Sequence, residues 1–181
     1  MDDKSLPSQE RLFQLFRFNF RTGRVYWRER PASDFVSRKA CAIWNARFSN
    51  EEAFITVDGQ GYYHGRIGNN RPKAHSVIWC AAYGTWPKQI DHINGDRLDN
   101  RLANLREVTS QQNNRNRRIP LTNTSGVIGV VKRRDSGRWR AYINNGGRRE
   151  WIGSYDKFDD AVAARRKAER DYGYHPNHGR P

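Results

Sequence analysis

The sequence predicts an α+β protein assembled from small modules, on three observations. Apolar residues make up only 36% of the 181 residues, so one large core is not expected. Short runs rich in aromatic and β-branched residues alternate with Gly- and Asn-containing turns, as in antiparallel hairpins. Two segments carry helix signals instead, one near residue 110 and one after residue 156. We expect N-terminal β-hairpins, a central strand–strand–helix unit, and a C-terminal three-stranded antiparallel sheet packed on one helix.

The chain is strongly basic. Its 33 Lys and Arg residues outweigh 19 Asp and Glu residues, for a formal net charge of +14, which favours binding to a polyanion through phosphate contacts. Aromatic residues reach 12%, too many for a disordered polycation. Basic residues concentrate between Gln111 and Glu150, where the only acidic residues are Asp135 and Glu150. Nucleic acid is therefore the first partner to consider.

Cysteine usage and hydropathy indicate the compartment. Cys41 and Cys80 fit no zinc-ligand spacing, and two thiols in a chain of this size favour a reducing compartment. The longest apolar run, Val77 to Tyr83, is too short to cross a bilayer, and the first ten residues lack a signal-peptide core. We expect a cytoplasmic protein with no membrane association and no obligate protein partner.

The chain is expected to divide into five segments. In the first, a short helix is predicted through Ser76 to Tyr83, while residues 31–50 fit no pattern. In the second, the order is strand, long polar loop, strand and helix. The expected boundaries are 1–87 for the β-rich lead-in, 88–118 for the central module, 119–125 for a linker, 126–174 for the sheet-and-helix module and 175–181 for the tail.

Both predicted helices of the later modules carry terminal signals. Thr109 followed by Gln112 is a capping box, which places Asn113 in the first turn. For the last helix, Asp156 is expected as the N-cap and Gly173 as the C-terminal exit. The face of this helix that packs on the sheet is expected to be formed by Ala161, Ala164, Ala168 and Tyr172.

Alternation along the middle strand of the C-terminal module predicts two unlike faces. Trp139, Ala141 and Ile143 fall on one face, which must cover the helix. The other face is expected to be basic with interleaved aromatic residues, a surface suited to phosphates and base edges, although a solvated arginine face is the alternative. Its expected members are Arg138, Arg140, Tyr142 and Asn144, joined by Arg133, Arg149 and Trp151.

This segment resembles the APETALA2/ethylene-response-factor DNA-binding domain over about residues 125–173. The likeness lies in SGVIGVVKRRDSGRWRAYI, in REWIGSYD and in the alanine-rich helix. It implies a sheet laid in the major groove of duplex DNA. Two positions often held by base-contacting arginines in the plant domains are Ile128 and Val131 here, so the target sequence does not transfer. Matching positions imply DNA contacts for Arg133, Arg138, Arg140, Arg149 and Trp151.

Asp91 and His92 stand side by side before an Asn-Gly turn, and the turn does not explain them. Cleaving a phosphodiester needs an activated water and a way to neutralise developing charge. His92 suits the base, because its ordinary pKa lies near neutral pH. Asp91 and Asn113 offer oxygen ligands for Mg²⁺ or Mn²⁺, and Asn104 is expected to hold the loop against the histidine. A plain polar turn is the alternative; a calcium loop fails, because alternate positions give Ile93 and Gly95.

The stretch IDHINGDRLDNRLANLREVTSQQNNRN resembles the HNH nuclease motif, in the form of phage-type homing endonucleases in which asparagine replaces the final histidine. The resemblance implies a ββα-metal fold, with Asp91 and Asn113 as metal ligands, His92 as general base and Asn104 as the structural asparagine. LFQLFRFNFRTGRVYWRER and AHSVIWCAAYGTWP are similar to the usual lead-in. It also implies a homing role, and a location in the host cytoplasm if a phage encodes the protein.

We therefore expect a magnesium-dependent endonuclease that hydrolyses phosphodiester bonds in double-stranded DNA, with nicking of one strand as the simpler expectation and cleavage of both strands as the alternative. The arginines after the catalytic helix are expected to contact phosphates between the two modules; they are Arg115, Arg117 and Arg118. One alternative is a DNA-binding regulator with an inactive nuclease module, and another is an RNA-directed nuclease or binder. Other histidines are expected in non-catalytic roles. His64 and His75 are expected in the core or in hydrogen bonds, and His175 and His178 in a flexible tail, with metal binding by these two as the alternative.

Overall fold

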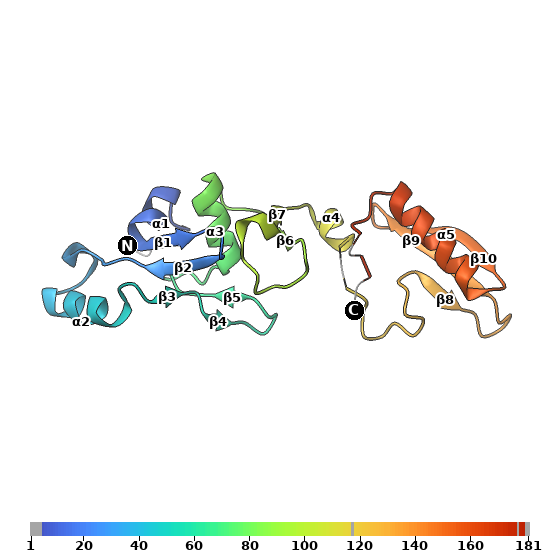
Figure 1. Cartoon of the computed structure of the whole chain (residues 1–181), viewed down its shortest axis with the longest axis horizontal. Helices are drawn as coiled ribbons and strands as arrows, with labels where there is room; N and C mark the ends of the chain where they lie inside the picture. Colours follow the sequence, from blue (N-terminus) through green and yellow to red (C-terminus); the bar gives the residue numbers. More distant parts are fainter. Residues whose placement is uncertain (1–4, 117, 177, 180–181) are drawn as a thin grey trace. The chain divides into compact units, whose positions relative to one another are not determined.

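The structure, a computed structural model, describes residues 5–116, 118–176 and 178–179 (Figure 1). It consists of short helices and several small antiparallel sheets, which confirms the predicted α+β class. Contacts divide the chain into two compact units, Met1–Glu107 and Val108–Pro181.

The first unit is built around a hairpin. Strands β1 (Phe16–Asn19) and β2 (Arg24–Trp27) pair in antiparallel fashion across a turn that contains Thr22 and Gly23, and β3 (Glu52–Ala53) adds to the other edge of β2. Helix α3 (Ala74–Tyr83) confirms the helix expected through this segment and ends at Gly84, whose φ is 80°. The fully buried side chains of the core belong to Leu12, Phe16, Val25, Val77 and Ile78.

Two helices of this unit were not predicted. Helix α1 (Gln9–Leu15) begins at Ser8, whose hydroxyl accepts a hydrogen bond from the Arg11 amide (3.2 Å), and α1 lies beside α3 (Figure 1). The aromatic content of this region suggested strands throughout, which was wrong before residue 16. Helix α2 (Arg38–Phe48) buries only Cys41, so its sequence lacks the apolar stripe by which helices are found.

The remaining strands of the first unit form two small hairpins. Strands β4 (Thr56–Val57) and β5 (Tyr63–His64) pair across a turn that contains Asp58 and Gly59. Strands β6 (Ile90–His92) and β7 (Leu105–Glu107) pair in antiparallel fashion, with a long loop between them that ends in the 3₁₀ turn η2 (Leu102–Asn104). This is the strand–loop–strand order expected for the central module.

The second unit begins with helix α4 (Ser110–Asn114), and its predicted capping box is confirmed. The Thr109 amide donates to Gln112 Oε1 (2.8 Å), and the Gln112 amide donates to Thr109 Oγ1 (3.2 Å). These reciprocal bonds satisfy two of the amide groups that a helix start leaves without intrahelical partners.

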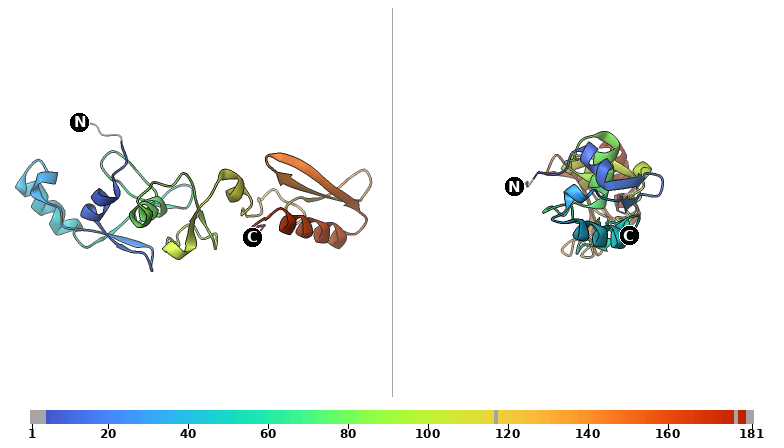
Figure 2. Two further views of the ribbon diagram at one scale, coloured as in Figure 1. Left: turned by 90° about the horizontal axis from the view of Figure 1, so that it is seen from above. Right: turned by 90° about the vertical axis from the view of Figure 1, so that its left-hand side faces the viewer.

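A three-stranded antiparallel sheet backed by one helix completes the second unit, as predicted. Helix α5 (Phe158–Asp171) runs along one face of the sheet (Figures 1 and 2), where Ala161 packs on Val130 and Ala141. Alternation along the middle strand therefore holds, with Ala141 and Ile143 buried and Asn144 exposed. The strand order is β10 (Arg148–Tyr155), β9 (Trp139–Asn145), β8 (Val130–Lys132).

Two details of α5 differ from expectation. The N-cap is Lys157, because the Asp156 carboxylate instead pairs with Arg138 (2.9 Å). The buried face of the helix includes Arg165 and Glu169 beside Ala161, while Ala164 and Ala168 are only half-buried. An ion pair thus replaces part of the expected alanine face. Gly173, with φ of 65°, is the helix exit as predicted.

Arg165 explains how a charged residue can be buried there. Its guanidinium donates to the carbonyl of Tyr142 (2.7 Å) and to Glu169 Oε1 (3.0 Å). His178 Nε2 lies 3.3 Å from the same guanidinium, and the His178 side chain is buried. The expectation of a flexible tail was therefore wrong for His178, because its buried ring packs against the guanidinium of Arg165.

Both cysteines are buried and reduced, and burial raises the pKa of the Cys80 thiol. Among the residues that the structure describes, no helix is long and apolar enough to cross a membrane.

Candidate active site

Strand β6 presents Asp91 and His92 to different surroundings. In the β6–β7 pair, Asp91 lies opposite Arg106 and His92 lies opposite Leu105. Successive side chains of a strand point to opposite sides, so one strand can offer a carboxylate and an imidazole to two different sets of partners. Both side chains are buried, at 7% and 3% exposed.

The Asp91 carboxylate is bonded by Arg106, a residue that the sequence did not single out. Arg106 Nη2 and Nε lie 2.6 and 2.9 Å from Asp91 Oδ2. The arginine side chain is 33% exposed, so the pair lies at the edge of the interior. Arg106 could be found from the sequence only by pairing β6 with β7. That pairing predicts the contact only when the strand register, which sets Asp91 opposite Arg106, is already known.

His92 is held by a buried amide and two aromatic rings. Its Nε2 lies 3.1 Å from Oδ1 of Asn100, and its ring centroid lies 5.2 Å from that of His75 and 5.8 Å from that of Tyr62. Burial lowers the pKa of His92, against the opposing effects of the Asn100 hydrogen bond and of the Asp91 charge. The imidazole is therefore neutral at neutral pH, the form in which it can accept a proton.

His75 adjoins the candidate site although its sequence context indicated only a core or hydrogen-bonding role. It lies on α3, and burial, followed by the charge of His92, lowers its pKa to about 3. Its ring also contacts Tyr62 edge-on, with centroids 5.2 Å apart. Two neutral histidines and one tyrosine thus form a single cluster.

Two cations lie over Tyr62. Lys73 Nζ is 3.9 Å and Arg97 Cζ is 5.0 Å from the centroid of the tyrosine ring. Each is also bonded to Gln60, through the side-chain oxygen and the backbone oxygen respectively. The charge of Lys73 also contributes to lowering the pKa of His75, the neighbour of Tyr62 in this cluster. Neither cation stood out in a sequence this rich in basic residues.

Asn104 closes the loop that joins β6 to β7. Its side-chain oxygen accepts from the Asn94 amide (3.0 Å), its side-chain nitrogen donates to the Asp99 carbonyl (2.8 Å), and its carbonyl accepts from the Ile93 amide (2.9 Å). The Arg101 guanidinium in turn lowers the pKa of Asp99. The side chain of Asn104 thus ties both ends of the loop, and its functional role stays a prediction.

Asn113, the second candidate metal ligand, lies on α4 in the second unit. It is half-buried, and its amide donates to the Thr109 carbonyl (2.9 Å). Its predicted partnership with Asp91 stays a prediction. As a donor set, a carboxylate and an amide oxygen fit a hard divalent ion that keeps water ligands. Within the described ranges, no group of three or more His, Cys, Asp or Glu side chains is arranged so that it could hold a metal ion.

In the second unit, arginines stack on aromatic rings on the sheet face that α5 does not cover. Arg140 lies over Trp151 (5.3 Å to the ring centroid), and Arg149 lies over Tyr142 (4.3 Å). Together with Val131 these four side chains line a hollow of about 210 Å³. Arg140, Tyr142, Arg149 and Trp151 were all expected on this face.

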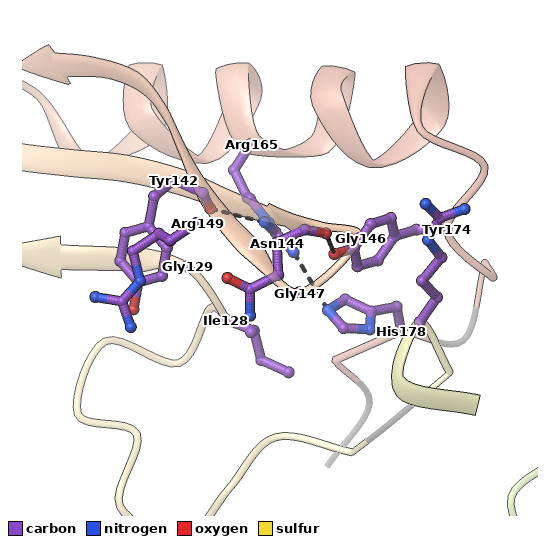
Figure 3. A pocket seen from close by; sticks show the side chains of 11 residues that line it. Ile128, Gly129, Tyr142, Asn144, Gly146, Gly147, Arg149, Arg165, Tyr174 and His178 are labelled. Carbon is purple, nitrogen blue, oxygen red and sulfur yellow. Dashed lines mark hydrogen bonds between the residues drawn. The ribbon is translucent and has the colours of Figure 1, made fainter. Parts of the chain in front are cut away.

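A larger pocket of about 540 Å³ adjoins the same face (Figure 3). Tyr142 and Arg149 border it at one end, and Tyr174 and His178 at the other. Arg115 enters it from the end of α4, with its guanidinium 5.5 Å from the Tyr174 ring centroid and Nη2 3.3 Å from Asn145 Oδ1. None of the described residues that line this pocket is acidic. Its lining residues are Arg115, Ile128, Gly129, Tyr142, Asn144, Gly146, Gly147, Arg149, Arg165, Tyr174 and His178.

The other predicted DNA contacts are placed differently. Arg133 is paired with Asp135, and Arg138 is bonded to Asp156 and to the Ser154 carbonyl (3.1 Å). These two arginines are thus engaged by neighbouring groups in the DNA-free structure. Arg118 is exposed, and Arg117 lies outside the described residues.

Comparison with known proteins bears on the segment that contains this site. Residues 72–115 match the family described as HNH endonuclease, a stretch that includes Asp91, His92, Asn104 and Asn113. Over 87 residues the chain is 36% identical to Protein 3.8 of Escherichia phage T7, and the match covers 47% of this chain and 72% of that protein. No solved structure matches the chain at a significant level.

Proposed function

Given that this chain belongs to the same family as Protein 3.8 of Escherichia phage T7 and carries an HNH endonuclease domain, we propose that it is a divalent-metal-dependent endonuclease of the homing type. The HNH domain indicates a nuclease with DNA as its substrate. The finer assignments concern the metal ligands, the DNA-binding surface and the biological role. We propose the nuclease module at residues 88–118 and the DNA-binding module at residues 126–174.

The observation that carries this proposal is a neutral, buried imidazole beside a buried carboxylate. His92, whose pKa is lowered by burial, accepts a proton from the attacking water. Asn104 keeps the β6–β7 loop closed around it through its bonds to Asn94 and Asp99. Lys73 and Arg97, which lie over Tyr62, are proposed as phosphate contacts beside the cluster of Tyr62, His75 and His92.

The metal would be held by Asp91 and Asn113, as Mg²⁺ or Mn²⁺. When bound, such an ion neutralises charge on the phosphate and on the leaving oxygen. Arg106 orients the Asp91 carboxylate through two bonds to Oδ2, and the capping box of α4 fixes the turn on which Asn113 lies. These bonds restrain the Asp91 side chain and the helical turn that carries Asn113, which supports the proposal that the two residues are metal ligands.

The second unit would hold the duplex in the manner of an APETALA2-like domain. The Arg140–Trp151 and Arg149–Tyr142 stacks provide guanidinium groups for phosphates or guanine edges, and aromatic rings for sugars or thymine methyl groups. The neighbouring pocket extends this basic surface to Arg115, at the end of the helix that carries Asn113. Arg118, Arg133 and Arg138 remain proposed phosphate contacts, and Arg117 remains a proposal from sequence alone.

Plasmid cleavage tests the metal assignment. Wild type should convert supercoiled DNA to nicked or linear forms in Mg²⁺ or Mn²⁺ and leave it intact in chelator. Asp91→Asn and Asn113→Ala should lose at least about two orders of magnitude in rate, while Asp159→Asn, on the exposed first turn of α5, should match wild type. Cleavage that persists in chelator, or in both ligand variants, would reject the assignment.

One observation favours a second candidate function. The carboxylate of Asp91 is already engaged by Arg106, as expected if the nuclease module no longer binds metal. The protein would then be a DNA-binding regulator with an inactive nuclease module. In that case wild type should shift duplex DNA in a gel with the same affinity in Mg²⁺ and in chelator, and no metal should support cleavage.

A further inference from the structure

We propose that Asn100 is a positioning residue for His92, and that the N-terminal hairpin β1–β2 holds Asn100 in place. Asn100 belongs to the β6–β7 loop, and a polar loop with Asn and Asp at turn positions needs no further explanation from sequence. The structure gives this asparagine a specific partner and a specific support. The inference deepens the proposed function, because it rests on His92 being the base.

Asn100 and His92 form a buried hydrogen-bonded pair. Asn100 is 3% exposed, and its Oδ1 lies 3.1 Å from Nε2 of His92. An amide oxygen only accepts hydrogen bonds, so in a neutral imidazole the proton of this pair belongs to Nε2. The lone pair then belongs to Nδ1, which becomes the atom that accepts a proton. Asn100 thereby selects both the tautomer and the direction of the ring.

The turn of the β1–β2 hairpin lies directly against the backbone of Asn100. Gly23, in the turn between β1 and β2, has φ of 71°, and a Cβ added there would lie 2.3 Å from the Asn100 carbonyl carbon and 2.4 Å from the Arg101 nitrogen. Only a residue without a side chain allows the two backbones to approach this closely. Next to this contact, the Leu102 amide donates to the Phe20 carbonyl (3.0 Å). The turn of the hairpin thus packs against the backbone of residues 100–102.

The Asn100–His92 hydrogen bond and the approach of Gly23 to Asn100 give the N-terminal hairpin a function in the proposed reaction. Without it, the loop backbone at Asn100 would lose its support, although Asn104 would still close the ends of the loop. The ring of His92 would keep its contacts with His75 and Tyr62 but lose the acceptor that fixes its proton.

The test is nitrogen-15 NMR of the imidazole of His92 in the full chain without metal or DNA. Wild type should show the neutral tautomer with the proton on Nε2, and a slowly exchanging Nε2–H signal. Asn100→Ala should lose that signal, whereas Asn100→Asp, which keeps an acceptor oxygen, should retain it. A wild-type proton on Nδ1, or a signal unchanged in Asn100→Ala, would overturn the proposal.

A pair of glycine substitutions tests the support. Gly23→Ala should also remove the Nε2–H signal, because the new Cβ must displace the loop. Gly68→Ala is the matched control: Gly68 also has positive φ, at 57°, but an added Cβ there meets nothing within 4 Å. Equal effects of the two substitutions on His92 would refute the support. In wild type, a nuclear Overhauser contact between the Gly23 α-protons and the Arg101 amide should be present, and its absence would refute the support without any substitution.

Cleavage separates this inference from the proposed function. If wild type cuts DNA, Asn100→Ala should lower kcat by on the order of 10–100-fold with DNA affinity unchanged. A kcat equal to that of wild type would overturn the positioning role. If wild type does not cut DNA, the proposed function fails, and the NMR results alone decide whether Asn100 sets the tautomer of His92.

Discussion

Arg106 and Asp91 are direct cross-strand partners, and the guanidinium bonds the same carboxylate oxygen twice, through Nη2 at 2.6 Å and Nε at 2.9 Å. Two bonds to Oδ2 hold that oxygen in place. Because Asp91 is only 7% exposed, this arginine also compensates for the loss of hydration of a buried charge. The candidate metal ligand is therefore oriented by the protein itself.

Replacing Arg106 should destabilise the folded protein, because the buried Asp91 carboxylate loses its ion-pair partner. Arg106→Gln is expected to lower the free energy of unfolding by about 1–3 kcal/mol, since it leaves a buried acceptor poorly paired. Denaturant unfolding measures this. The matched control is Arg24→Gln, which removes a 2.7 Å ion pair to Glu52 whose side chains are 58% and 33% exposed; it should cost less than about 1 kcal/mol. Equal losses would contradict the account.

Asn104→Ala should open the loop between β6 and β7. Two hydrogen bonds, to the Asn94 amide and the Asp99 carbonyl, are lost, and their partners lie within the fold. We expect a loss of about 1–3 kcal/mol in unfolding free energy and faster hydrogen exchange at the Asn94 amide. Asn70→Ala, which removes one exposed bond to the Ser5 carbonyl, should leave that amide unchanged. Unchanged protection of Asn94 in Asn104→Ala would argue against a closing role.

His75 should make the stability of the protein depend on pH. Its pKa is about 3 in the folded chain and near 6.5 when unfolded, so between these values the unfolded chain binds one more proton. The stability contributed by neutral His75 is complete above pH 6.5 and falls by about 1.4 kcal/mol per pH unit toward pH 3. The measurement is the difference in unfolding free energy between wild type and His75→Gln across this range. A difference that does not change with pH would disprove the shift.

Arginines on the sheet face of the second unit should contribute to DNA affinity through phosphates. Arg140→Gln and Arg149→Gln are each expected to weaken duplex binding and to reduce the slope of log affinity against log salt by about one. Arg170→Gln, at an exposed position of α5, should leave the slope unchanged. Fluorescence anisotropy over a range of salt concentrations measures all three. If Arg170→Gln reduced the salt slope as much as the other two substitutions, the sheet face would not be the specific DNA-binding surface of the unit.

Much of the fold followed from local signals in the sequence. The capping box at Thr109 and the alternation around Ala141 depend on neighbouring residues, and both are present in the structure. The helices α1 and α2 were missed for a physical reason. Helix α1 is only seven residues long, too short to establish an apolar period of 3.6 residues, and it runs directly into the aromatic strand β1. Helix α2 has little buried surface and therefore lacks an apolar stripe.

The site was only partly predictable. The motif singled out Asp91, His92 and Asn104, which lie on the same strand pair and its loop. It could not single out Arg106 or Asn100, because these partners depend on strand register and on the burial of one loop asparagine among several. His75 was assigned to a core or hydrogen-bonding role. Its contact with His92 arises from packing between α3 and the strand pair, which no local pattern encodes.

The most direct test of the central claim is cleavage of supercoiled DNA in Mg²⁺ by wild type, His92→Ala and His64→Ala at equal concentrations. His64 is a half-buried histidine on β5, so its substitution controls for the loss of an imidazole. Wild type and His64→Ala should nick or linearise the plasmid at similar rates, and His92→Ala should be slower by about two to four orders of magnitude. Cleavage by His92→Ala at the wild-type rate would contradict the assignment of His92 as the base.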